Sequence, residues 1–517
     1  MNRAAGIQQL VNTTIWDMVI IGGGATGLGA AVDAANRGYK TLLIEQNDFA
    51  NATSSRSTKL VHGGVRYLKQ GNFKLIKEAL KERKILLQNA PHVCNSLQFV
   101  IPVYTWFSKW YYGMGLKLYD FISGKHSLGK TTMVSKASVL QLLPTINTKN
   151  LCGGIVYFDG QFDDARLAIN LAQTATGKGA VVLNYCTATD FNIVNNSIKS
   201  ITVKDEISKV DYCVKAKICI NATGVFADAL LYIINKQHLP IIKASQGVHI
   251  VIDKKYLPTT TALMIPATTD GRVLFAIPWH NKIVIGTTDT PIENIVIEPI
   301  ALQHEVDFII STLNSYLQIK ITQQQVLSVF AGLRPLVQAQ AIKNTASLSR
   351  EHIIINEKNG MITITGGKWT TYRLMAEEVI NMASKIAALP YVPCSTINLP
   401  IHGKPTHNNL DDTLSIYGTQ AAGIKLLIQK KPSLGTYLHP NYLFTHVQVV
   451  YAVRVEMALT VTDFLARRIR LLFLDAAAAI AIAPLVAKIM ADELYQNDEW
   501  IQQQIVKFNS IAQQYVL

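Results

Sequence analysis

Short apolar runs joined by glycine turns open the chain and predict a strand, a helix and a second strand. Residues 18–21 form the first apolar run, 25–37 are mostly small and apolar, and 41–44 form the second run. Short apolar runs bounded by glycine indicate buried strands, and the longer stretch of small residues indicates a helix. The opening pattern therefore predicts a βαβ unit.

Helical and strand patterns continue to alternate further along. Residues 72–89 have helical periodicity, a second helix is expected from about Asp164, and 217–224 indicate a buried strand with a helix from Ala227 after it. The adjacent Asp163 and Asp164 could suggest a metal or acid–base pair. They stand where a helix N-cap belongs, so capping is the simpler explanation.

The pattern changes twice beyond residue 240. Alternation typical of strands dominates 241–318, which indicates an inserted, largely antiparallel sheet. A strand, a Gly-Gly turn and a helix recur at 361–380, and beyond Pro390 helix follows helix. The expected domains are a discontinuous nucleotide-binding domain at 15–95, 150–240 and 330–388, a substrate-binding cap at 96–149 and 241–329, and a helical domain at 390–517.

Composition narrows the class of protein. A chain of 517 residues is too long for one compact core, and 49% hydrophobic with 16% charged residues describe a globular protein. The 49 Lys and Arg exceed the 35 Asp and Glu, and the net charge of +14 suits nucleic acid, an anionic membrane surface or small anionic substrates. Because no basic run or arginine–aromatic array occurs, no nucleic-acid partner is expected.

Cysteine spacing and apolar stretches bear on the compartment. The six cysteines lack C-x-x-C spacing, so they are expected to be thiols in a reducing compartment, and no metal site is predicted. Residues 1–16 contain one Arg and no long apolar core, unlike a secretory signal. The apolar stretch 476–487 is interrupted by Pro484 and is too short to span a bilayer, so any membrane association should be peripheral.

Two segments could contact a membrane, and each has a plainer explanation. Residues 97–150 are rich in aromatics such as Trp106, which could form a membrane-facing patch, a substrate-domain segment or ordinary core. Arg467, Arg468 and Arg470 could pair with phospholipid headgroups or form a solvated basic face.

The glycines of the opening turn match a dinucleotide-binding fingerprint. Gly22 permits a tight turn, Gly24 lets the backbone approach a pyrophosphate, and Gly27 lets the helix pack close to the strand. The helix N-terminus offers N–H groups to the phosphates, and Glu45 can accept hydrogen bonds from ribose hydroxyls. The motif predicts a dinucleotide, with NAD and FAD both open.

Six later side chains are candidates for chemistry. His249 alternates within a strand, where it is either a core histidine or a base. The Gly-Gly turn at the start of a helix could stabilise negative charge on a reduced flavin, with a lysine beside it. For His62, Arg66 and Tyr67 the plainer explanation is the start of a helix with a solvated basic face. For Arg334 and Lys368 it is a pair of solvated surface charges. The candidates are His62, Arg66, Tyr67, His249, Arg334 and Lys368.

Motifs along residues 15–495 resemble those of the FAD-dependent, quinone-linked glycerol-3-phosphate dehydrogenases. They are IIGGGATGLG, TSSRSTKLVHGGVRYL, FDDARL, NATG, IPWHNKIVIGTTDT, GLRPL, SREH, GGKWTTYR and, in the helical domain, VEMALTVTDFLARRIR. The resemblance implies an α/β fold: an FAD-binding Rossmann-like domain of the glutathione-reductase/D-amino-acid-oxidase type, with an inserted antiparallel-sheet substrate domain and a C-terminal all-helical domain.

The resemblance also implies an activity and its partners. Such an enzyme oxidises sn-glycerol 3-phosphate to dihydroxyacetone phosphate by hydride transfer to FAD and passes the electrons to a membrane quinone. It would lie in the cytoplasm, attached peripherally to an anionic inner (cytoplasmic) membrane, and could form a homodimer. The alternatives are a glycerol-3-phosphate oxidase or related flavin oxidase using oxygen, and a flavoprotein that acts mainly as a binding module. No calcium-binding loop of the kind found in some relatives occurs. No oxidase-type insertion occurs either, and this second absence favours quinone over oxygen.

Residue roles follow from the same resemblance. Clustered cationic groups suit a phosphate dianion, and a base with a pKa near neutral suits the substrate hydroxyl. The expected substrate-binding residues are Arg66, Tyr67, Arg334 and Lys368. The expected base is His249 before His62. The expected cofactor-binding residues are Gly22, Gly24, Ala25, Thr26, Gly27, Glu45, Gln46, Thr53, Ser54, Lys59, His62, Gly63, Gly64, Gly224, Gly366, Gly367, Lys368 and Thr370.

Overall fold

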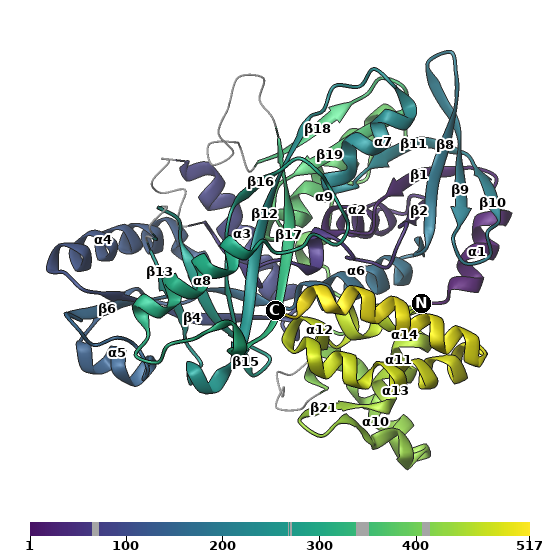
Figure 1. The fold of residues 1–517 in the computed structure, drawn as a ribbon. Coiled ribbons are helices and arrows are strands. Elements are labelled where there is room, and N and C mark those ends of the chain that lie inside the picture. The colour runs from purple at the N-terminus through teal and green to yellow at the C-terminus, as the bar shows by residue number, and fades with distance from the viewer. Residues whose placement is uncertain (65–71, 267, 269–270, 338–350, 406–413) are drawn as a thin grey trace.

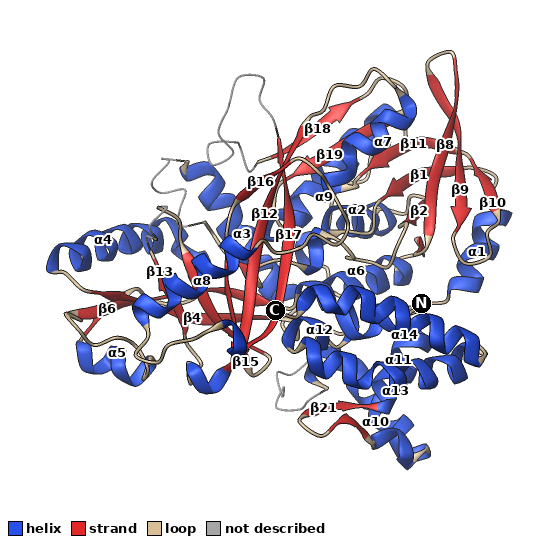
Figure 2. Ribbon diagram, viewed as in Figure 1, coloured by secondary structure: helices blue, strands red, loops and turns tan. Residues whose placement is uncertain are grey.

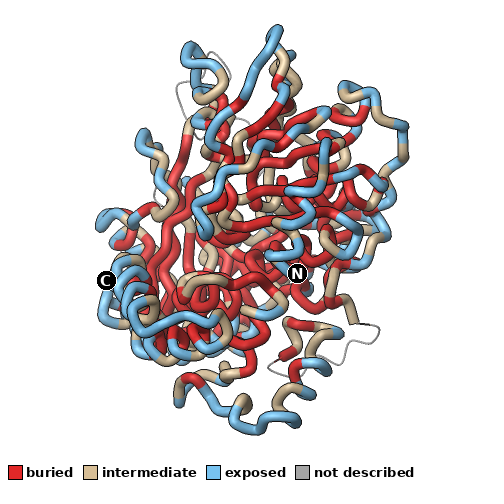
Figure 3. The backbone as a smooth tube through the Cα atoms, turned by 90° about the vertical axis from the view of Figure 1, so that its right-hand side faces the viewer, coloured by how far each residue is buried: buried red, intermediate tan, exposed pale blue. Residues whose placement is uncertain are grey.

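Two large β-sheets and a C-terminal group of helices make up most of the protein (Figures 1 and 2). The computed structural model describes residues 1–517 except 65–71, 267, 269–270, 338–350 and 406–413. Buried backbone runs through the interior along the strands, and exposed backbone lies at the periphery (Figure 3).

The first sheet has six strands in the order β18-β19-β11-β1-β2-β7. Its neighbours are parallel except for the edge pair β18 and β19. Inner strands such as β1 and β2 are buried on both faces, which explains their continuous apolar runs. The bounds are Trp16–Ile21 (β1), Thr41–Ile44 (β2), Val181–Leu183 (β7), Ala216–Asn221 (β11), His352–Asn356 (β18) and Met361–Gly366 (β19).

Three helices pack together over this sheet. Helix α2 (Ala25–Asn36) contacts both α6 (Asp164–Gly177) and α9 (Tyr372–Ile386). A Cβ on Gly29 would lie 2.8 Å from the Tyr372 ring, so the small residues of α2 permit this close approach. The predicted βαβ unit is confirmed. The predicted cap of α6 is confirmed as well, because the Asp163 side chain accepts a hydrogen bond from the backbone of the first turn.

The second sheet has ten strands in the order β16-β12-β15-β14-β13-β4-β6-β3, with β17 also paired to β12 and β5 to β6. Its pairs are antiparallel except β13 with β4, which confirms the predicted antiparallel insertion. Strands β6 and β17, which lie in segments expected for the nucleotide-binding domain, pair here. The bounds are Leu60–Val61 (β3), Cys94–Val103 (β4), Thr132–Val134 (β5), Gly153–Phe162 (β6), Ile242–Asp253 (β12), Ala262–Ile265 (β13), Leu274–Trp279 (β14), Lys282–Gly286 (β15), Thr290–Ile292 (β16) and Val326–Val337 (β17).

Smaller elements surround the two sheets. The predicted helix at 72–89 is confirmed as α3, where the Asn72 side chain caps the first turn. Strands β8, β9 and β10 form a separate antiparallel sheet. The bounds are Arg3–Asn12 (α1), Phe73–Asn89 (α3), Trp106–Ser123 (α4), Lys136–Leu142 (α5), Ala227–Ile234 (α7), Gln303–Tyr316 (α8), Cys186–Val194 (β8), Ser197–Asp205 (β9) and Asp211–Val214 (β10).

The C-terminal part is helical, as predicted, with one unpredicted hairpin of β20 and β21. Its helices share an apolar cluster with Val251 and Phe330 of the large sheet. Within the described residues, no helix combines the length and apolarity that crossing a bilayer requires. The bounds are Ala421–Lys430 (α10), His446–Glu456 (α11), Leu471–Leu474 (α12), Ala476–Leu494 (α13), Asp498–Ala512 (α14), Tyr437–His439 (β20) and Tyr442–Thr445 (β21).

The arginines before α12 correct one expectation. Arg467, Arg468 and Arg470 are buried, not directed at headgroups or solvent. Arg467 Nε and Arg468 Nη1 each lie 2.6 Å from Asp48 Oδ2, and Arg470 Nη2 lies 3.1 Å from Asp164 Oδ1. Both readings of this cluster were wrong, because these cations pair with carboxylates of the nucleotide-binding half and join the helical part to it.

Candidate active site

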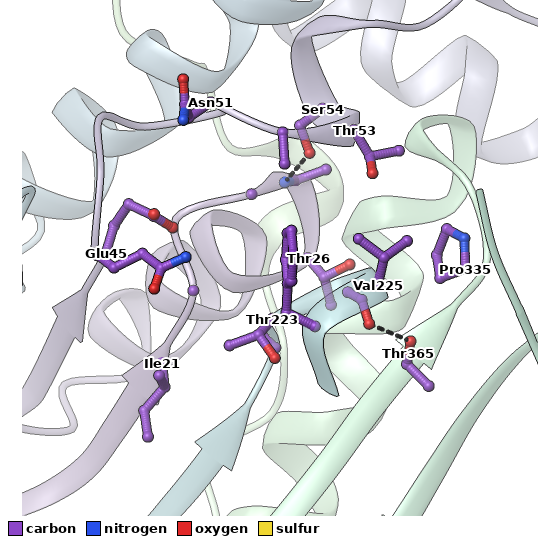
Figure 4. A pocket seen from close by; sticks show the side chains of 18 of the residues that line it. Ile21, Thr26, Glu45, Asn51, Thr53, Ser54, Thr223, Val225, Pro335 and Thr365 are labelled. Carbon is purple, nitrogen blue, oxygen red and sulfur yellow. Dashed lines mark hydrogen bonds between the residues drawn. The ribbon is translucent and has the colours of Figure 1, made fainter. Parts of the chain in front are cut away.

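Two adjoining cavities have volumes of about 340 and 270 Å³. The first lies at the carboxyl ends of β1, β2 and β11 (Figure 4). Ligands of open α/β sheets bind at this edge. The two cavities have walls in common and form one cleft, long enough for an extended ligand. The shared residues are Thr53, Pro335, Gly367, Lys368 and Trp369.

The first cavity begins at the glycine turn between β1 and α2. Gly22 has a φ of +115°, and a Cβ there would lie 2.6 Å from the carbonyl oxygen of Ala222. A Cβ on Gly27 would overlap the carbonyl oxygen of Gly22, and one on Gly24 would lie 3.1 Å from Ser54 Oγ. Side chains would fill this turn, whereas glycines leave a cradle at the α2 N-terminus that suits a pyrophosphate.

Glu45 lies at the end of β2 and lines the same cavity. Its Oε2 accepts a hydrogen bond from Gly23 N (2.6 Å) and its Oε1 accepts one from Asn47 N (2.9 Å). Burial raises the pKa of this carboxyl. Across the turn, Ser54 Oγ accepts from Ala25 N (2.9 Å; Figure 4). The other predicted residues in this wall are Gly22, Gly24, Thr26, Gln46, Thr53, Gly224, Gly366, Gly367 and Lys368.

His249, on β12, lines the second cavity. Its Nε2 lies 2.9 Å from Thr58 Oγ1, and its ring stacks on Phe330 at 4.9 Å. Burial, together with the charges of Lys59 and Arg334, lowers the pKa of His249 well below its usual value. The imidazole is therefore neutral at neutral pH. Its Nδ1 has no hydrogen-bond partner within the described residues, so a ligand can supply one.

Arg334, on β17, lines the second cavity as well. Its Nη2 donates to Thr287 Oγ1 and to the Thr288 carbonyl oxygen, both at 3.0 Å, and its Nη1 donates to the Gln246 carbonyl oxygen at 3.2 Å. Asp289 Oδ1 lies 3.5 Å from Nη1. These contacts hold the guanidinium in place, while 23% of the side chain stays accessible to a ligand.

The second glycine turn lies where the cavities join. Gly366 and Gly367 have φ values of +80° and +73°, a conformation that side chains disfavour. Lys368 follows them at the start of a 3₁₀ turn and lines both cavities. Thr370 Oγ1 donates to the carbonyl oxygen of His62 at 3.5 Å, and both residues line the second cavity.

Lys59 is placed behind the cavity rather than in its wall. Its Nζ is fully buried and donates to Asp164 Oδ2 (2.7 Å) and to the Ser55 carbonyl oxygen (2.8 Å). Burial lowers the pKa of this lysine to about 7. Lys59 Nζ also lies 5.3 Å from the centroid of the Phe330 ring, on which His249 stacks. The role of Lys59 in cofactor binding stays a prediction.

Other expected residues take different places. Gly63 packs where a Cβ would overlap the Tyr119 hydroxyl, so it permits close packing and does not line either cavity. Gly64 has a φ of +80° and is likewise outside both walls. Arg66 and Tyr67 lie outside the described residues, and their role in substrate binding stays a prediction.

Sequence reasoning missed several neighbours of the site. Thr58 bonds to His249, although it stands in the hydroxyl-rich segment SSRST, which was a usable signal. Gly286 on β15 leaves room for the imidazole, because a Cβ there would overlap the ring. Arg56 lines the second cavity, with its guanidinium 2.6 Å from Glu298. The last two contacts depend on strand register and burial, which carry no local pattern.

The residues present fit a bound dinucleotide with a redox ring. The glycine cradle and the Glu45 carboxylate suit the adenosine and pyrophosphate half, and the Gly366–Gly367 turn lies beyond them at the junction. A neutral histidine and a fixed guanidinium line the continuing cavity, where a substrate belongs. The fold and this cleft define a flavin-dependent oxidoreductase.

Comparisons with known proteins agree with this class. Residues 17–373 match the family of FAD dependent oxidoreductases, and 361–501 match the C-terminal domain of alpha-glycerophosphate oxidase. The chain is 37% identical to the mitochondrial glycerol-3-phosphate dehydrogenase of Homo sapiens, covering 98% of this chain and 74% of that protein. A mitochondrial glycerol-3-phosphate dehydrogenase of Arabidopsis thaliana is 38% identical, over 92% and 82%.

A solved structure is similar over almost the whole length. The glycerol-3-phosphate dehydrogenase from Bacillus halodurans, complexed with FAD, has a TM-score of 0.82 and 28% identity, covering 99% of this chain and 97% of that one. The predicted fold class and the FAD cofactor are confirmed. The chain belongs to the family of FAD-dependent glycerol-3-phosphate dehydrogenases.

Proposed function

We propose that the protein oxidises sn-glycerol 3-phosphate to dihydroxyacetone phosphate and passes the electrons to a membrane quinone. The observation that carries the proposal is the second cavity, where the neutral His249 imidazole and the fixed Arg334 guanidinium share one wall next to the flavin site. A base and an anion-binding group in one small cavity match a phosphorylated alcohol better than an amine. The names of the relatives support the same substrate.

Arg334 and Lys368 are proposed to bind the phosphate. A guanidinium offers two parallel donors to phosphate oxygens, which gives orientation as well as charge. Arg334 is already fixed by Thr287, so binding costs it little conformational entropy. Lys368 lies at the junction of the cavities and adds a second positive charge. Arg66 and Tyr67 are proposed to complete this group.

His249 is proposed as the base that takes the proton from the C2 hydroxyl. Its lowered pKa keeps the ring unprotonated but makes it a weaker base than the near-neutral histidine that the sequence led us to expect. The proton can go to Nδ1, which has no partner among the described residues, or to the Thr58-bonded Nε2. FAD held by the first cavity would supply the hydride acceptor for C2 of the substrate. Apolar walls from Phe99, Tyr157 and Met264 exclude water from the reacting alcohol. His62 is the second candidate for the base.

The electron acceptor and the location are further parts of the proposal. A quinone acceptor places the protein at a membrane, and we propose peripheral attachment to an anionic cytoplasmic membrane, with a second copy of the chain as a possible partner. The relatives in human and Arabidopsis are named as mitochondrial. The net charge of +14 supports attraction to anionic lipid.

One anaerobic experiment tests both half-reactions. Glycerol 3-phosphate added to the purified holoenzyme without oxygen is expected to bleach the flavin absorption, and a soluble quinone is expected to restore it. Glycerol, which lacks the phosphate, serves as the matched control and is expected to bleach it far more slowly. Absence of bleaching by glycerol 3-phosphate rejects the substrate, and also revives the reading of the chain as a binding module.

A second candidate function is a glycerol-3-phosphate oxidase. The match of residues 361–501 to the C-terminal domain of alpha-glycerophosphate oxidase favours it. This oxidase differs from the proposed dehydrogenase only in the electron acceptor, which would be oxygen instead of a quinone. Peroxide formed stoichiometrically with substrate in air, at a rate that added quinone does not change, would select oxygen.

A further inference from the structure

Helix α4 carries an exposed apolar face of unusual size. Seven large apolar side chains of this one helix are between 46% and 83% exposed. At 3.6 residues per turn they fall within an arc of about 140°. Single exposed apolar residues are ordinary, but a contiguous aromatic stripe marks a binding surface. The seven are Trp106, Phe107, Trp110, Tyr111, Met114, Leu118 and Phe121.

The opposite face of α4 is anchored in the protein. Leu116 lies in an apolar cluster with Phe99 and Tyr157 of β4 and β6, and Tyr119 packs with Leu80 of α3. Tyr119 also donates a hydrogen bond to Asp159 (3.2 Å). The helix is therefore held by one side, and it lies at the edge of the molecule (Figure 1). The side chains of its aromatic stripe are exposed.

Lysines occur on α4 and on the neighbouring helix α3. Helix α3, which packs against α4, carries lysines that fall within an arc of about 80° of its surface. The segment from Tyr104 to Lys136 contains five lysines and a single acid, Asp120, whose carboxylate accepts a hydrogen bond from the Thr131 backbone. The lysines of α3 are Lys74, Lys77, Lys81 and Lys84, and those near α4 include Lys109, Lys117 and Lys125.

The exposed aromatic residues and the neighbouring lysines together favour an anionic bilayer as the binding partner of this surface. Trp and Tyr favour the interface of a bilayer, where an aromatic ring meets both chains and headgroups, and flanking lysines favour anionic lipid. Lys109 Nζ lies 5.4 Å from the Trp106 ring centroid, so a cation and an interfacial aromatic occur side by side. We propose that the aromatic stripe of α4 inserts into the interface of an anionic bilayer, while the lysines of α3 and α4 bind its headgroups.

This docking has a consequence for the second cavity. Phe99 and Tyr157, which share the apolar cluster with α4, also line that cavity. A docked α4 therefore brings the lipid surface to the side of the protein where substrate is oxidised. In this respect the inference rests on the proposed function, because a membrane-dissolved acceptor would then meet the enzyme near the flavin site.

Vesicle binding by the holoenzyme tests the inference. The variant with Trp106→Ser, Phe107→Ser and Trp110→Ser is compared with a control carrying Leu239→Ser, Tyr391→Ser and Tyr495→Ser, which are 80%, 76% and 95% exposed. Vesicles contain phosphatidylcholine alone, or equal parts of phosphatidylcholine and phosphatidylglycerol. The α4 variant is expected to bind the anionic vesicles at least about tenfold more weakly than the control and the unchanged protein. Lys74→Glu with Lys117→Glu should abolish only the preference for anionic lipid.

Two outcomes overturn the inference. One is equal binding of the α4 variant and the control. The other is that the unchanged protein does not bind vesicles and that the α4 variant has a lower molecular mass in solution than the unchanged protein and the control. That result assigns the α4 face to contact with a second copy of the chain. Bleaching of the flavin by glycerol 3-phosphate, recorded on the same samples, reports the proposed function separately. The α4 variant should bleach normally and lose only the reduction of a quinone held in vesicles.

Discussion

Oγ1 of Thr58 lies 2.9 Å from Nε2 of His249, although 191 positions separate the two residues in the chain. Thr58 follows the first 3₁₀ turn and His249 is in the large sheet, so this contact joins the nucleotide-binding half to the substrate side. The hydrogen bond sets the rotation of an imidazole whose ring stacks on Phe330.

Removing the Thr58 hydroxyl should therefore slow the chemical step. Thr58→Val keeps the shape of the side chain and deletes a hydrogen bond of about 1 kcal/mol, so kcat is expected to fall about fivefold to tenfold with little change in KM. Thr58→Ser, which keeps the hydroxyl, is the matched control. Stopped-flow recording of flavin bleaching under anaerobic conditions measures the step. If the valine variant bleaches as fast as the serine variant, the positioning role is wrong.

The pH dependence of kcat should report the low pKa of His249. Burial and then the charges of Lys59 and Arg334 lower that pKa, so the ring stays neutral at pH 6.5 and gains its proton only in more acidic solution. Protonation removes the proton acceptor, and the acidic limb of kcat is expected well below pH 6.5. Measurement at saturating substrate keeps the titration of the phosphate of free glycerol 3-phosphate out of the pH profile of kcat.

His249→Gln provides the contrast for that profile. The amide does not titrate, so the acidic limb should disappear together with most of the activity, by a factor on the order of 10² or more. His62→Gln, in the same cavity, is the matched control. A limb that persists in the His249 variant and vanishes in the His62 variant would transfer the role of base to His62.

Arg334 should control recognition of the phosphate. Arg334→Gln removes charge-assisted hydrogen bonds of about 2 kcal/mol, so KM for glycerol 3-phosphate is expected to rise about 30-fold, with a smaller effect on kcat. Preference for glycerol 3-phosphate over glycerol should fall by a similar factor. Arg454→Gln, which breaks an exposed pair with Glu493, is the control. Equal KM values in the two variants would exclude Arg334 from the phosphate site.

Local pattern predicted the parts of the fold that local residues determine. The glycine turn at Gly22 and the helix that Asn72 caps needed only neighbours in sequence, and both are confirmed. The pairing of β6 with β4 and of β17 with β12 in the large sheet was not predicted, because apolar strands do not encode their partners. For the same reason, the contact between Thr58 and His249 was not predicted. The prediction of FAD rather than NAD needed the family motifs in addition to the glycine turn at Gly22.

Buried charge was the least predictable feature. Arg467 and Arg468 were interpreted as surface cations because most arginines are exposed. The pair of Arg467 with Asp463, four positions apart, is local. Asp48, with which both arginines pair, lies 419 and 420 positions away in the chain, so no sequence window contains this pairing. Such pairs become visible only once the helical domain and the nucleotide-binding half are seen together.

Asp48 should be critical for attachment of the helical domain. Asp48→Asn removes the carboxylate that two buried guanidinium groups share, which costs about 3 kcal/mol. The remaining carboxylates are Asp463, 2.7 Å from Arg467, and Glu456, 3.6 Å from Arg468. The temperature of unfolding of the holoenzyme is expected to fall by several degrees, and protease should cut the helical domain sooner. Asp190→Asn, on the exposed part of β8, is the control. Identical unfolding of the two variants would mean that other contacts hold the domain.

Acid should weaken the same attachment. Although burial opposes it, Arg468 and Arg467 lower the pKa of Asp48 from 3.8 to about 2. A carboxyl with a depressed pKa stabilises the folded protein fully above its unfolded value and loses that effect as pH falls through the folded value. The protein is therefore expected to lose stability from this group as pH falls below about 4. Comparison of unfolding temperatures over that range with those of Asp48→Asn measures it, since the asparagine variant lacks the titrating group and should show a shallower dependence on pH.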